Sequence, residues 1–322
     1  MILKPIQKSL KLRSLEALVR RLSRAHPKFS AVESQLSRAY SGYLGEKSID
    51  YYLEMLPDQD IIILHDLRLP YQNYSFQIDI LLLTLAWFFI LEAKNNGGEI
   101  VVDPLNHQLI QTLNGTQKVY PDPLLQIQLQ QYQLIKWFKN RSLDIPPIES
   151  AVVMTNHHAK LNILQGNLEY YKKIIRSNFL LSKINETNNI HQNKKFTHDE
   201  ILAIAKLLIN AHTPLKPNVL DDFQIQPTEI LTGVICPKCA TFSMKWKRGV
   251  WRCQHCDFTS PVAHIDALKD HALLLGDEIT NQQFREFLHI DSPDTAQKML
   301  SMMGFPHHGS NRGRKYVLKF DD

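Results

Sequence analysis

Two apolar stretches of the sequence each contain acidic residues that a buried β-strand would not normally hold. The first includes Gln77-Ile-Asp79 and the second includes Leu91-Glu92-Ala-Lys94. If the chain reverses between residues 85 and 86, antiparallel pairing places Asp79 opposite Glu92. Directly opposed side chains share a face of the sheet, with Cβ atoms about 4.5–5.5 Å apart. Two carboxylates this close repel each other unless a proton or a cation lies between them.

Oxygen ligands at this spacing suit Mg²⁺ or Mn²⁺, which keep several waters and accept one or two carboxylates together with a phosphate. Lys94 follows Glu92 by two residues, so its ammonium group shares the same face of the strand. The same pairing places Gln77 opposite Lys94. We therefore expect a divalent-cation site on a β-hairpin, the alternative being an edge hairpin with a structural Asp–Lys pair.

Two helical segments offer further polar groups to this hairpin. Glu46 shares a helical stripe with Ile49 and Leu53, so we expect it to face the protein interior, where an unpaired charge is costly. Gln126 lies one turn into a second helix, either beside the hairpin or in a solvated row that includes Gln130. Glu46 is therefore a candidate site residue, and for Gln126 both interpretations stay open.

Four motifs in this order resemble the nuclease-related domain (NERD). They are Gly42-Tyr-Leu-Gly45-Glu46, Phe76-Gln-Ile-Asp79, Ile90-Leu-Glu92-Ala-Lys94-Asn and Pro123-Leu-Leu-Gln126. The resemblance spans residues 36–155, and the family is assigned to the PD-(D/E)xK nuclease-like superfold. It implies an α/β fold, a mixed sheet flanked by helices as in restriction endonucleases.

The resemblance also implies a role for each candidate residue. Asp79 and Glu92 would hold Mg²⁺ or Mn²⁺, with help from the backbone carbonyl between Glu92 and Lys94. Lys94 would orient or activate the attacking water and stabilise charge on the phosphate. Glu46 would complete the acidic cluster, and Gln126 would support the site. A metal-bound water and a Lewis-acid cation are what phosphodiester cleavage requires.

All four cysteines lie in one 21-residue window, as Cys236-x-x-Cys239 and Cys253-x-x-Cys256. Each pair forms a tight turn, and two such turns supply four thiolates for tetrahedral Zn²⁺. In a reducing compartment this clustering favours a metal site over disulfides. Four protein ligands leave no open position on the metal, so we expect structural zinc in a zinc ribbon over residues 233–260.

Basic residues accompany the cysteines and recur near the C-terminus. In the ribbon, cations alternate with Trp246 and Trp251. Such a face can bind phosphates and stack on bases, although tryptophans packed on a neighbouring domain would give the same pattern. The expected nucleic-acid contacts are Lys245, Lys247, Arg248 and Arg252 in the ribbon, and Arg312, Arg314 and Lys315 near the C-terminus.

The region after the ribbon resembles a winged helix-turn-helix. We expect helices over 265–275, 281–288 and 293–303, followed by a basic hairpin. A capping box at Thr280 marks the start of the second helix, and Ser292-Pro293 marks the start of the third. In this reading the third helix enters a groove of the duplex and the hairpin contacts phosphates. A helical tail used for protein contact is the alternative.

The remaining patterns set the expected elements and domains. Helices are predicted over 14–26, 30–56 (stopped by Pro57), 123–140 and 201–211. Strands are predicted over 61–64, 76–94 (two strands) and 151–154. A meander over 99–120 is expected to continue the sheet, and a polar loop is expected over 181–196. The predicted domains are a basic N-terminal helical arm (1–35), the nuclease-like domain (36–212), a Pro-marked linker (213–232), the zinc ribbon (233–260) and the winged-helix-like region (261–322).

Composition limits the function further. The 322 residues are 44% hydrophobic and 21% charged, values typical of globular domains. The net charge of the chain is +5; the first 40 residues have a net charge of +7, and the rest of the chain has a net charge of −2. This basic segment is either a solvated helix face or a nucleic-acid contact. The N-terminus lacks the apolar stretch of a signal peptide, and the longest apolar stretch, residues 80–91, is too short to span a membrane. We expect a cytoplasmic protein with no membrane contact.

The leading hypothesis is a metal-dependent nuclease or DNA-processing protein. Its partner would be nucleic acid, with DNA preferred, bound by the C-terminal modules. The alternative is a catalytically silent nucleic-acid-binding or regulatory protein on a nuclease-derived scaffold. An interaction adaptor without a nucleic-acid ligand is the third hypothesis, and it gives no use to the acidic cluster.

Overall fold

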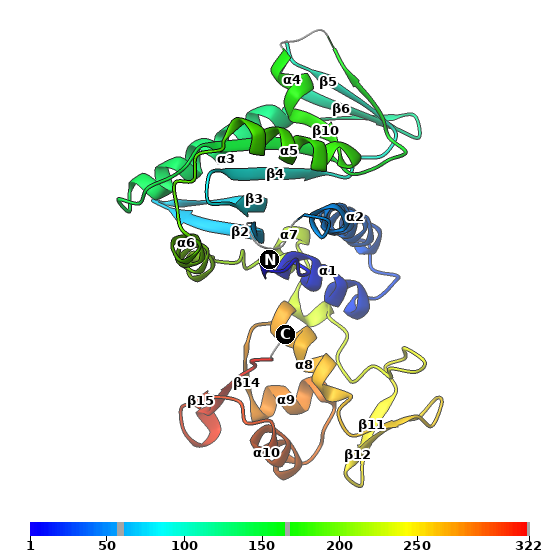
Figure 1. Cartoon of the computed structure of the whole chain (residues 1–322). Coiled ribbons are helices and arrows are strands. Elements are labelled where there is room, and N and C mark those ends of the chain that lie inside the picture. Colours follow the sequence, from blue (N-terminus) through cyan, green and yellow to red (C-terminus); the bar gives the residue numbers. More distant parts are fainter. Residues whose placement is uncertain (57–60, 165–167, 321–322) are drawn as a thin grey trace. The chain divides into compact units, whose positions relative to one another are not determined.

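The computed structural model describes residues 1–56, 61–164 and 168–320. The chain divides into two compact units (Figure 1): Met1–Lys8 with Arg38–Leu215, and Ser9–Ser37 with Lys216–Asp322. The basic segment expected over residues 1–35 is divided between them. Its first strand pairs within the first unit, and its helix packs within the second.

A six-stranded mixed sheet forms the centre of the first unit. Strands β2, β3 and β4 are antiparallel, whereas β1 on β2, β4 on β8 and β8 on β10 are parallel. The strand order is β1 (Ile2–Lys4), β2 (Ile62–Tyr71), β3 (Tyr74–Leu83), β4 (Phe88–Lys94), β8 (Ile148–Met154) and β10 (Ile174–Arg176). A mixed sheet flanked by helices is the arrangement expected from the sequence.

The β3–β4 hairpin has the predicted register. Its ladder runs from Leu83 opposite Phe88 to Ile80 opposite Leu91, so Asp79 and Glu92 are the next positions beyond its end. The β3–β4 ladder does not extend to Gln77 and Lys94, so the expected pairing of these two residues is not formed. On the other edge of β3, Gln77 pairs with Arg68 of β2.

Helices cover both faces of this sheet. On one face, α3 (Pro123–Lys139) and α6 (His198–Ala211) pack on alternate residues of β2, β3 and β4. On the other face, α5 (Leu180–Ile190) packs together with Ile49 and Leu53 of α2 (Phe29–Leu53). The residue proposed to stop α2, Pro57, lies outside the described residues. Two layers of helices thus bury the strands that carry the acidic motifs.

Two helix starts follow their sequence signals. The Asp122 side chain accepts a hydrogen bond from the backbone N–H of Leu124 at 2.8 Å, with proline at the first helical position of α3. Thr197 and Glu200 form the predicted capping box of α6. The capping residue therefore fixes where α3 begins, and with it the position of Gln126.

Two expectations about this unit are wrong. The meander forms a separate four-stranded sheet of β7 (Thr116–Pro121), β6 (Gln108–Leu113), β5 (Glu99–Asp103) and β9 (Lys160–Ile163). The chain leaves the main sheet after Lys94 and enters this second sheet after Gly98, whose φ of 79° is accessible to glycine without strain. The Asn-rich stretch expected as a loop contains helix α5 instead, because Leu180 and Ile184 bury one face of it in the core. A short helix α4 (Leu168–Lys173) precedes β10.

The second unit is built around one hydrophobic cluster shared by two small sheets and their helices. The helices are α1 (Leu10–Arg21), α7 (Val219–Phe223), α8 (His264–Leu274), α9 (Asn281–Leu288) and α10 (Pro293–Met302). The strands are β11 (Met244–Lys247), β12 (Val250–Cys253) and β13 (Thr259–Ser260), and β14 (Glu278–Thr280), β16 (Lys315–Val317) and β15 (His307–His308). The three helices and the hairpin expected near the C-terminus are present. Along the described part of the chain, no helix has the length and hydropathy needed to cross a membrane.

A buried ion pair joins α1 to α8. Arg21 is 0% exposed, and its Nε donates to Oδ2 of Asp270 at 2.8 Å. Its Nη1 donates to the carbonyls of Leu231 and Gly233. Arg20, whose side chain is 47% exposed, donates to the other oxygen of Asp270. The buried Asp270 carboxylate therefore balances the positive charge of Arg21.

Replacing Arg21 tests this pair. The Arg21→Ala variant leaves Asp270 buried with only a surface partner, so we expect the free energy of unfolding of the second unit to fall by about 3–5 kcal/mol. Arg20→Ala is the matched control and should cost less than about 1 kcal/mol. Urea unfolding followed by tryptophan fluorescence measures both values. Equal losses in the two variants would contradict the assignment.

Candidate active site and cysteine cluster

The two acidic motifs meet where β3 and β4 separate. The backbone N–H of Ala93 donates to Oδ2 of Asp79 at 3.0 Å, so the carboxylate of β3 reaches the backbone of β4. Beyond the last ladder pair, Nζ of Lys94 lies 2.7 Å from Oε1 of Glu92. The hairpin therefore brings Asp79, Glu92 and Lys94 to one place.

Three side chains hold the Glu92 carboxylate, which is 4% exposed. Its Oε1 accepts hydrogen bonds from Lys94 and from Nε2 of Gln126, both at 2.7 Å, and its Oε2 accepts one from Gln130 at 2.8 Å. Lys94 also donates to Oε1 of Gln126 at 2.9 Å. Gln126 thus lies at the candidate site and not in a solvated row.

Gln130 is a site residue that the sequence analysis assigned to solvent. It is 6% exposed, and its Nε2 also donates to the backbone carbonyl of Gln77. Within the described part of the chain, its Oε1 accepts no hydrogen bond. The available signal was its spacing of four residues from Gln126, which places both on one helix face. A buried amide next to a carboxylate fixes the position of Glu92.

Helix α2 approaches the same place through a glycine. A Cβ atom on Gly45 would lie 2.5 Å from Cβ of Asn95, so only glycine allows this approach. Nδ2 of Asn95 donates to the carbonyl of Ser41 at 2.8 Å and ties the start of this helix segment to the end of β4. The next residue, Glu46, is half-buried, and it is close enough to Asp66, Glu92 and Lys94 for their charges to affect its pKa.

Like charges perturb these carboxylates strongly. Burial and the charges of Asp66 and Glu92 raise the pKa of Glu46 to about 7, against the opposing effect of Lys94. Burial, Glu92 and Glu46 raise the pKa of Asp79 well above its usual range. Asp66 of β2 is a second residue that the sequence analysis missed, because it carries no motif. Ionising the whole group requires a compensating positive charge.

The acidic group can offer a metal ion two carboxylate ligands, and it does not surround the ion with protein ligands. Among the described residues, only the four cysteines bring three or more Cys, His, Asp or Glu ligand atoms within 4.8 Å of one another. Mg²⁺ commonly takes one or two carboxylates and completes its shell with water and substrate phosphate. Asp79 and Glu92, with their buried mutual repulsion, fit a cation of this kind.

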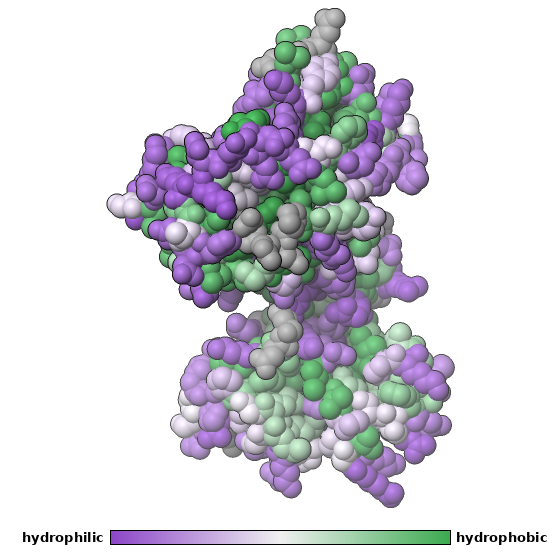
Figure 2. Space-filling view, in the orientation of Figure 1, coloured by the Kyte–Doolittle hydropathy of each residue, from purple (hydrophilic) through white to green (hydrophobic). Residues whose placement is uncertain are grey.

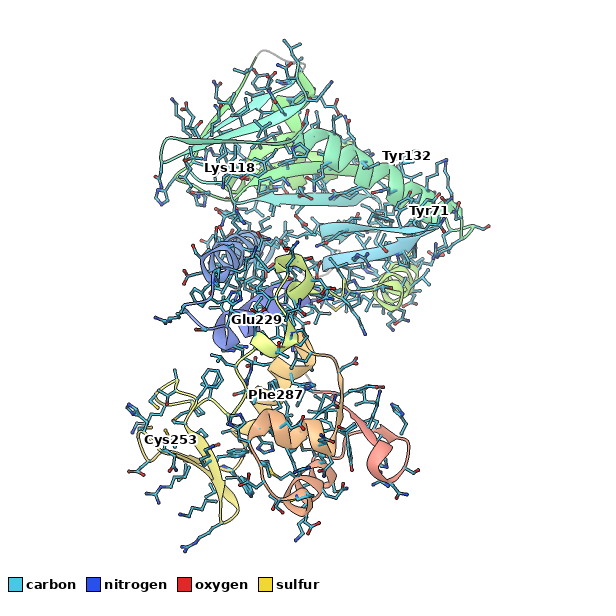
Figure 3. All side chains as sticks on the ribbon, turned by 180° about the vertical axis from the view of Figure 1, so that it is seen from behind. Tyr71, Lys118, Tyr132, Glu229, Cys253 and Phe287 are labelled. Atoms are coloured by element: carbon cyan, nitrogen blue, oxygen red, sulfur yellow. The ribbon has the colours of Figure 1, made fainter. Side chains whose placement is uncertain are left out.

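The four cysteines form the second candidate metal site. The Sγ atoms of Cys236 and Cys256 lie 3.7 Å apart, and those of Cys239 and Cys253 lie 3.6 Å apart. Four sulfur ligands placed tetrahedrally around zinc at about 2.3 Å would be about 3.8 Å from one another. Cys253, labelled in Figure 3, ends strand β12. The donor set and its spacing fit a structural zinc ion.

The basic residues of the β11–β12 hairpin are exposed, and its tip is hydrophilic in the space-filling view (Figure 2). Lys247, Arg248 and Arg252 line a hollow of about 460 Å³, although Arg252 is also paired with Asp257 at 2.8 Å. These side chains, with the exposed Lys245, form one basic surface. The four cations that the sequence assigned to the ribbon thus lie on one hairpin.

The tryptophans of this hairpin serve the core. Trp251 is 0% exposed and donates its Nε1–H to Nδ1 of His264 at 3.0 Å. Burial lowers the pKa of His264 to about 4, which keeps this nitrogen free to accept. Trp246 is half-buried against Trp251. The packing interpretation of the tryptophans therefore holds for Trp251, which cannot stack on a base.

The C-terminal basic residues differ in availability. Nζ of Lys315 pairs with Glu278 at 2.9 Å, and the Arg314 side chain is half-buried. The side chain of Arg312 lies outside the described part of the structure. The structure thus brings the ribbon cations together more clearly than those of the hairpin formed by β15 and β16.

A mixed sheet flanked by helices, with an acidic pair and a lysine at the end of a hairpin, is consistent with a nuclease-like α/β fold. Residues 41–155 match the family model of the nuclease-related domain. The matched range contains Glu46, Asp79, Glu92, Lys94 and Gln126. No curated protein and no solved structure matches the chain.

The raised pKa of Glu46 gives a prediction for stability. The folded state holds this proton up to about pH 7, whereas an unfolded glutamate releases it near pH 4.5. Without added divalent cation, the stability that the proton provides is complete below pH 4.5 and is lost as the pH rises through 7. Glu46→Gln should remove this dependence and stabilise the first unit at pH 8 by about 1–3 kcal/mol.

Urea unfolding of wild type and Glu46→Gln at pH 5, 6, 7 and 8 measures the effect. Glu54→Gln, an exposed residue near the end of the same helical region, is the control and should follow wild type. Parallel pH curves for Glu46→Gln and wild type would rule out a buried, perturbed Glu46.

Proposed function

We propose that this protein is a metal-dependent nuclease that hydrolyses phosphodiester bonds. The observation that carries the proposal is the meeting of Asp79, Glu92 and Lys94 beyond the last pair of the β3–β4 ladder. The match of residues 41–155 to the nuclease-related domain supports it. Buried acids that repel one another are stabilising only when a cation or proton offsets their charge.

Asp79 and Glu92 would hold Mg²⁺ or Mn²⁺. When bound, such a cation supplies Lewis-acid stabilisation of charge on the phosphate and lowers the pKa of a bound water. Gln126 and Gln130 keep Glu92 in place through hydrogen bonds to its two oxygens. Protein groups of this kind orient a ligand carboxylate and tune its affinity.

Lys94 would act on the substrate directly. Its ammonium group has three N–H donors, of which Glu92 and Gln126 take two. The third is available to the substrate: it would orient the attacking water or stabilise negative charge on a phosphate oxygen. A positive donor fixed by two acceptors can stabilise developing negative charge without reorganisation.

The second unit would bind the nucleic acid, with DNA preferred. The exposed cations of the β11–β12 hairpin would contact phosphates, and a zinc ion on the four cysteines would hold this hairpin as a zinc ribbon. The elements α8, β14, α9, α10, β15 and β16 would then form a winged helix-turn-helix. Arg312, Arg314 and Lys315 would add phosphate contacts from its hairpin.

One observation favours a second candidate, a catalytically silent nucleic-acid-binding or regulatory protein. Both oxygens of Glu92 already accept hydrogen bonds from Lys94, Gln126 and Gln130. A carboxylate that protein donors stabilise this well can serve a scaffold without a cation. Cleavage measurements separate the two candidates.

The nuclease proposal predicts cleavage of plasmid DNA or labelled oligonucleotides that requires added Mg²⁺ or Mn²⁺. Lys94→Ala removes the positive donor and should lower the rate by about 10²- to 10⁴-fold. Glu92→Ala should abolish the cation dependence together with the activity. Lys118→Ala, which alters an exposed residue of β7, is the matched control and should retain the wild-type rate.

Equal cleavage by wild type, Glu92→Ala and Lys94→Ala would reject the nuclease proposal. Binding without cleavage would favour the scaffold candidate, and its affinity should fall steeply with salt. Lys247→Ala combined with Arg248→Ala should weaken binding at low salt while leaving the fold of the first unit unchanged.

The zinc proposal makes a separate prediction. Purified protein should contain zinc in stoichiometric amount, and Cys253→Ser should lose it and unfold the second unit at a lower temperature, because metal binding contributes folding free energy. Elemental analysis and differential scanning calorimetry measure both effects. Ser243→Ala, beside Cys253, is the control for local packing. Full stability of Cys253→Ser would contradict a structural metal.

A further inference from the structure

Asp66 has an unusual backbone conformation within strand β2. Its φ is 45°, in the left-handed region that residues other than glycine rarely adopt. Ile62 and Leu64 before it and Leu67 and Leu69 after it enter the same hydrophobic cluster. In a regular strand these two pairs would lie on opposite faces. The turn at Asp66 therefore exchanges the two faces of the strand.

Two side chains hold this conformation. Nζ of Lys4, in β1, donates to the carbonyls of His65 and Asp66 at 2.7 and 2.9 Å. Nε2 of Gln77, in β3, donates to Oδ1 of Asp66 at 2.8 Å. Backbone and carboxylate are thus fixed from neighbouring strands on both sides. A strained residue that its surroundings fix in this way often belongs to a functional site.

The register places Asp66 in line with the candidate site. β2 and β3 pair His65 with Ile80 and Leu67 with Ile78, so Asp66 takes the position opposite Asp79. Asp79 in turn takes the position opposite Glu92 beyond the end of the next ladder. The three acids therefore follow one line across three adjacent strands. The charges of Asp66 and Glu92 both raise the pKa of Glu46, on α2.

The hydrogen bond from Gln77 does not require the charge of Asp66. It would be equally well accepted by the amide oxygen of asparagine, which also adopts the left-handed conformation more readily than most residues. The half-buried carboxylate adds repulsion to the acidic group, which the positive charge of Lys4 offsets in part. This negative charge has a use if the acidic group binds a cation.

We propose that Asp66 is a positioning residue of the candidate active site, whose negative charge, fixed in line with Asp79 and Glu92, strengthens divalent-cation binding by that pair. It acts by its electrostatic field and need not contact the cation. This inference rests on the proposed function, since it assumes that Asp79 and Glu92 hold a cation. Charges near a metal site commonly change its affinity without ligating the metal.

Mn²⁺ binding to zinc-loaded protein tests the proposal, with electron paramagnetic resonance of free Mn²⁺ as the readout. Asp66→Asn keeps the acceptor for Gln77 and removes the charge, so the Mn²⁺ affinity should fall by about 10- to 100-fold. Its melting temperature without Mn²⁺ should be equal to or above that of wild type, because repulsion on Glu46 is relieved. Asp144→Asn, whose side chain is 83% exposed, is the matched control.

The outcomes separate this inference from the proposed function. If the wild-type protein binds no Mn²⁺, or if Glu92→Gln leaves its Mn²⁺ affinity unchanged, the proposed function and the inference are both overturned. Weak binding by Glu92→Gln but wild-type affinity in Asp66→Asn would overturn the role of Asp66 alone. A fall in both affinity and melting temperature in Asp66→Asn would show a structural role and would also overturn it.

Discussion

The antiparallel register of β3 and β4 is the constraint on which the candidate site depends. Because the ladder ends at Ile80 and Leu91, the next residues carry their carboxylates into the space where the strands separate. The hydrogen bond from Ala93 N–H to Asp79 then bridges the opening. A shift of the register by one residue would turn every side chain of β4 to the other face and separate the acids. The apolar residues that bury both faces of the hairpin fix that register.

The elements around the hairpin bring charge together at an energetic cost. Capping by Asp122 sets the start of α3 so that Gln126 and Gln130 reach Glu92, and Gly45 allows α2 to deliver Glu46. Each added carboxylate raises the pKa of its neighbours, as Glu46 and Asp79 show. A fold selected for stability alone would replace such acids with apolar side chains. Their retention in a buried group is the physical argument for cation binding.

The second unit depends on different interactions. It combines a buried Arg21–Asp270 pair, a buried Trp251 bound to His264, and four cysteines at metal-ligand spacing. A metal on the cysteines would add folding free energy to these interactions. The cations of the β11–β12 hairpin remain on the surface because the aromatic residues between them are turned inward.

The sequence by itself determined the local features of this protein. Alternating apolar residues with a short reversal set the β3–β4 register, Asp122-Pro123 set the start of α3, and the spacing of the cysteines set the metal cluster, since each depends on residues close in the chain. Tertiary structure decided the rest. Gln130 and Asp66 became members of the acidic group only because separate elements meet there, and Trp251 became core only by packing on α8. The meander formed a sheet of its own after Lys94, and the Asn-rich stretch became α5, because contacts with distant residues outweighed local preference.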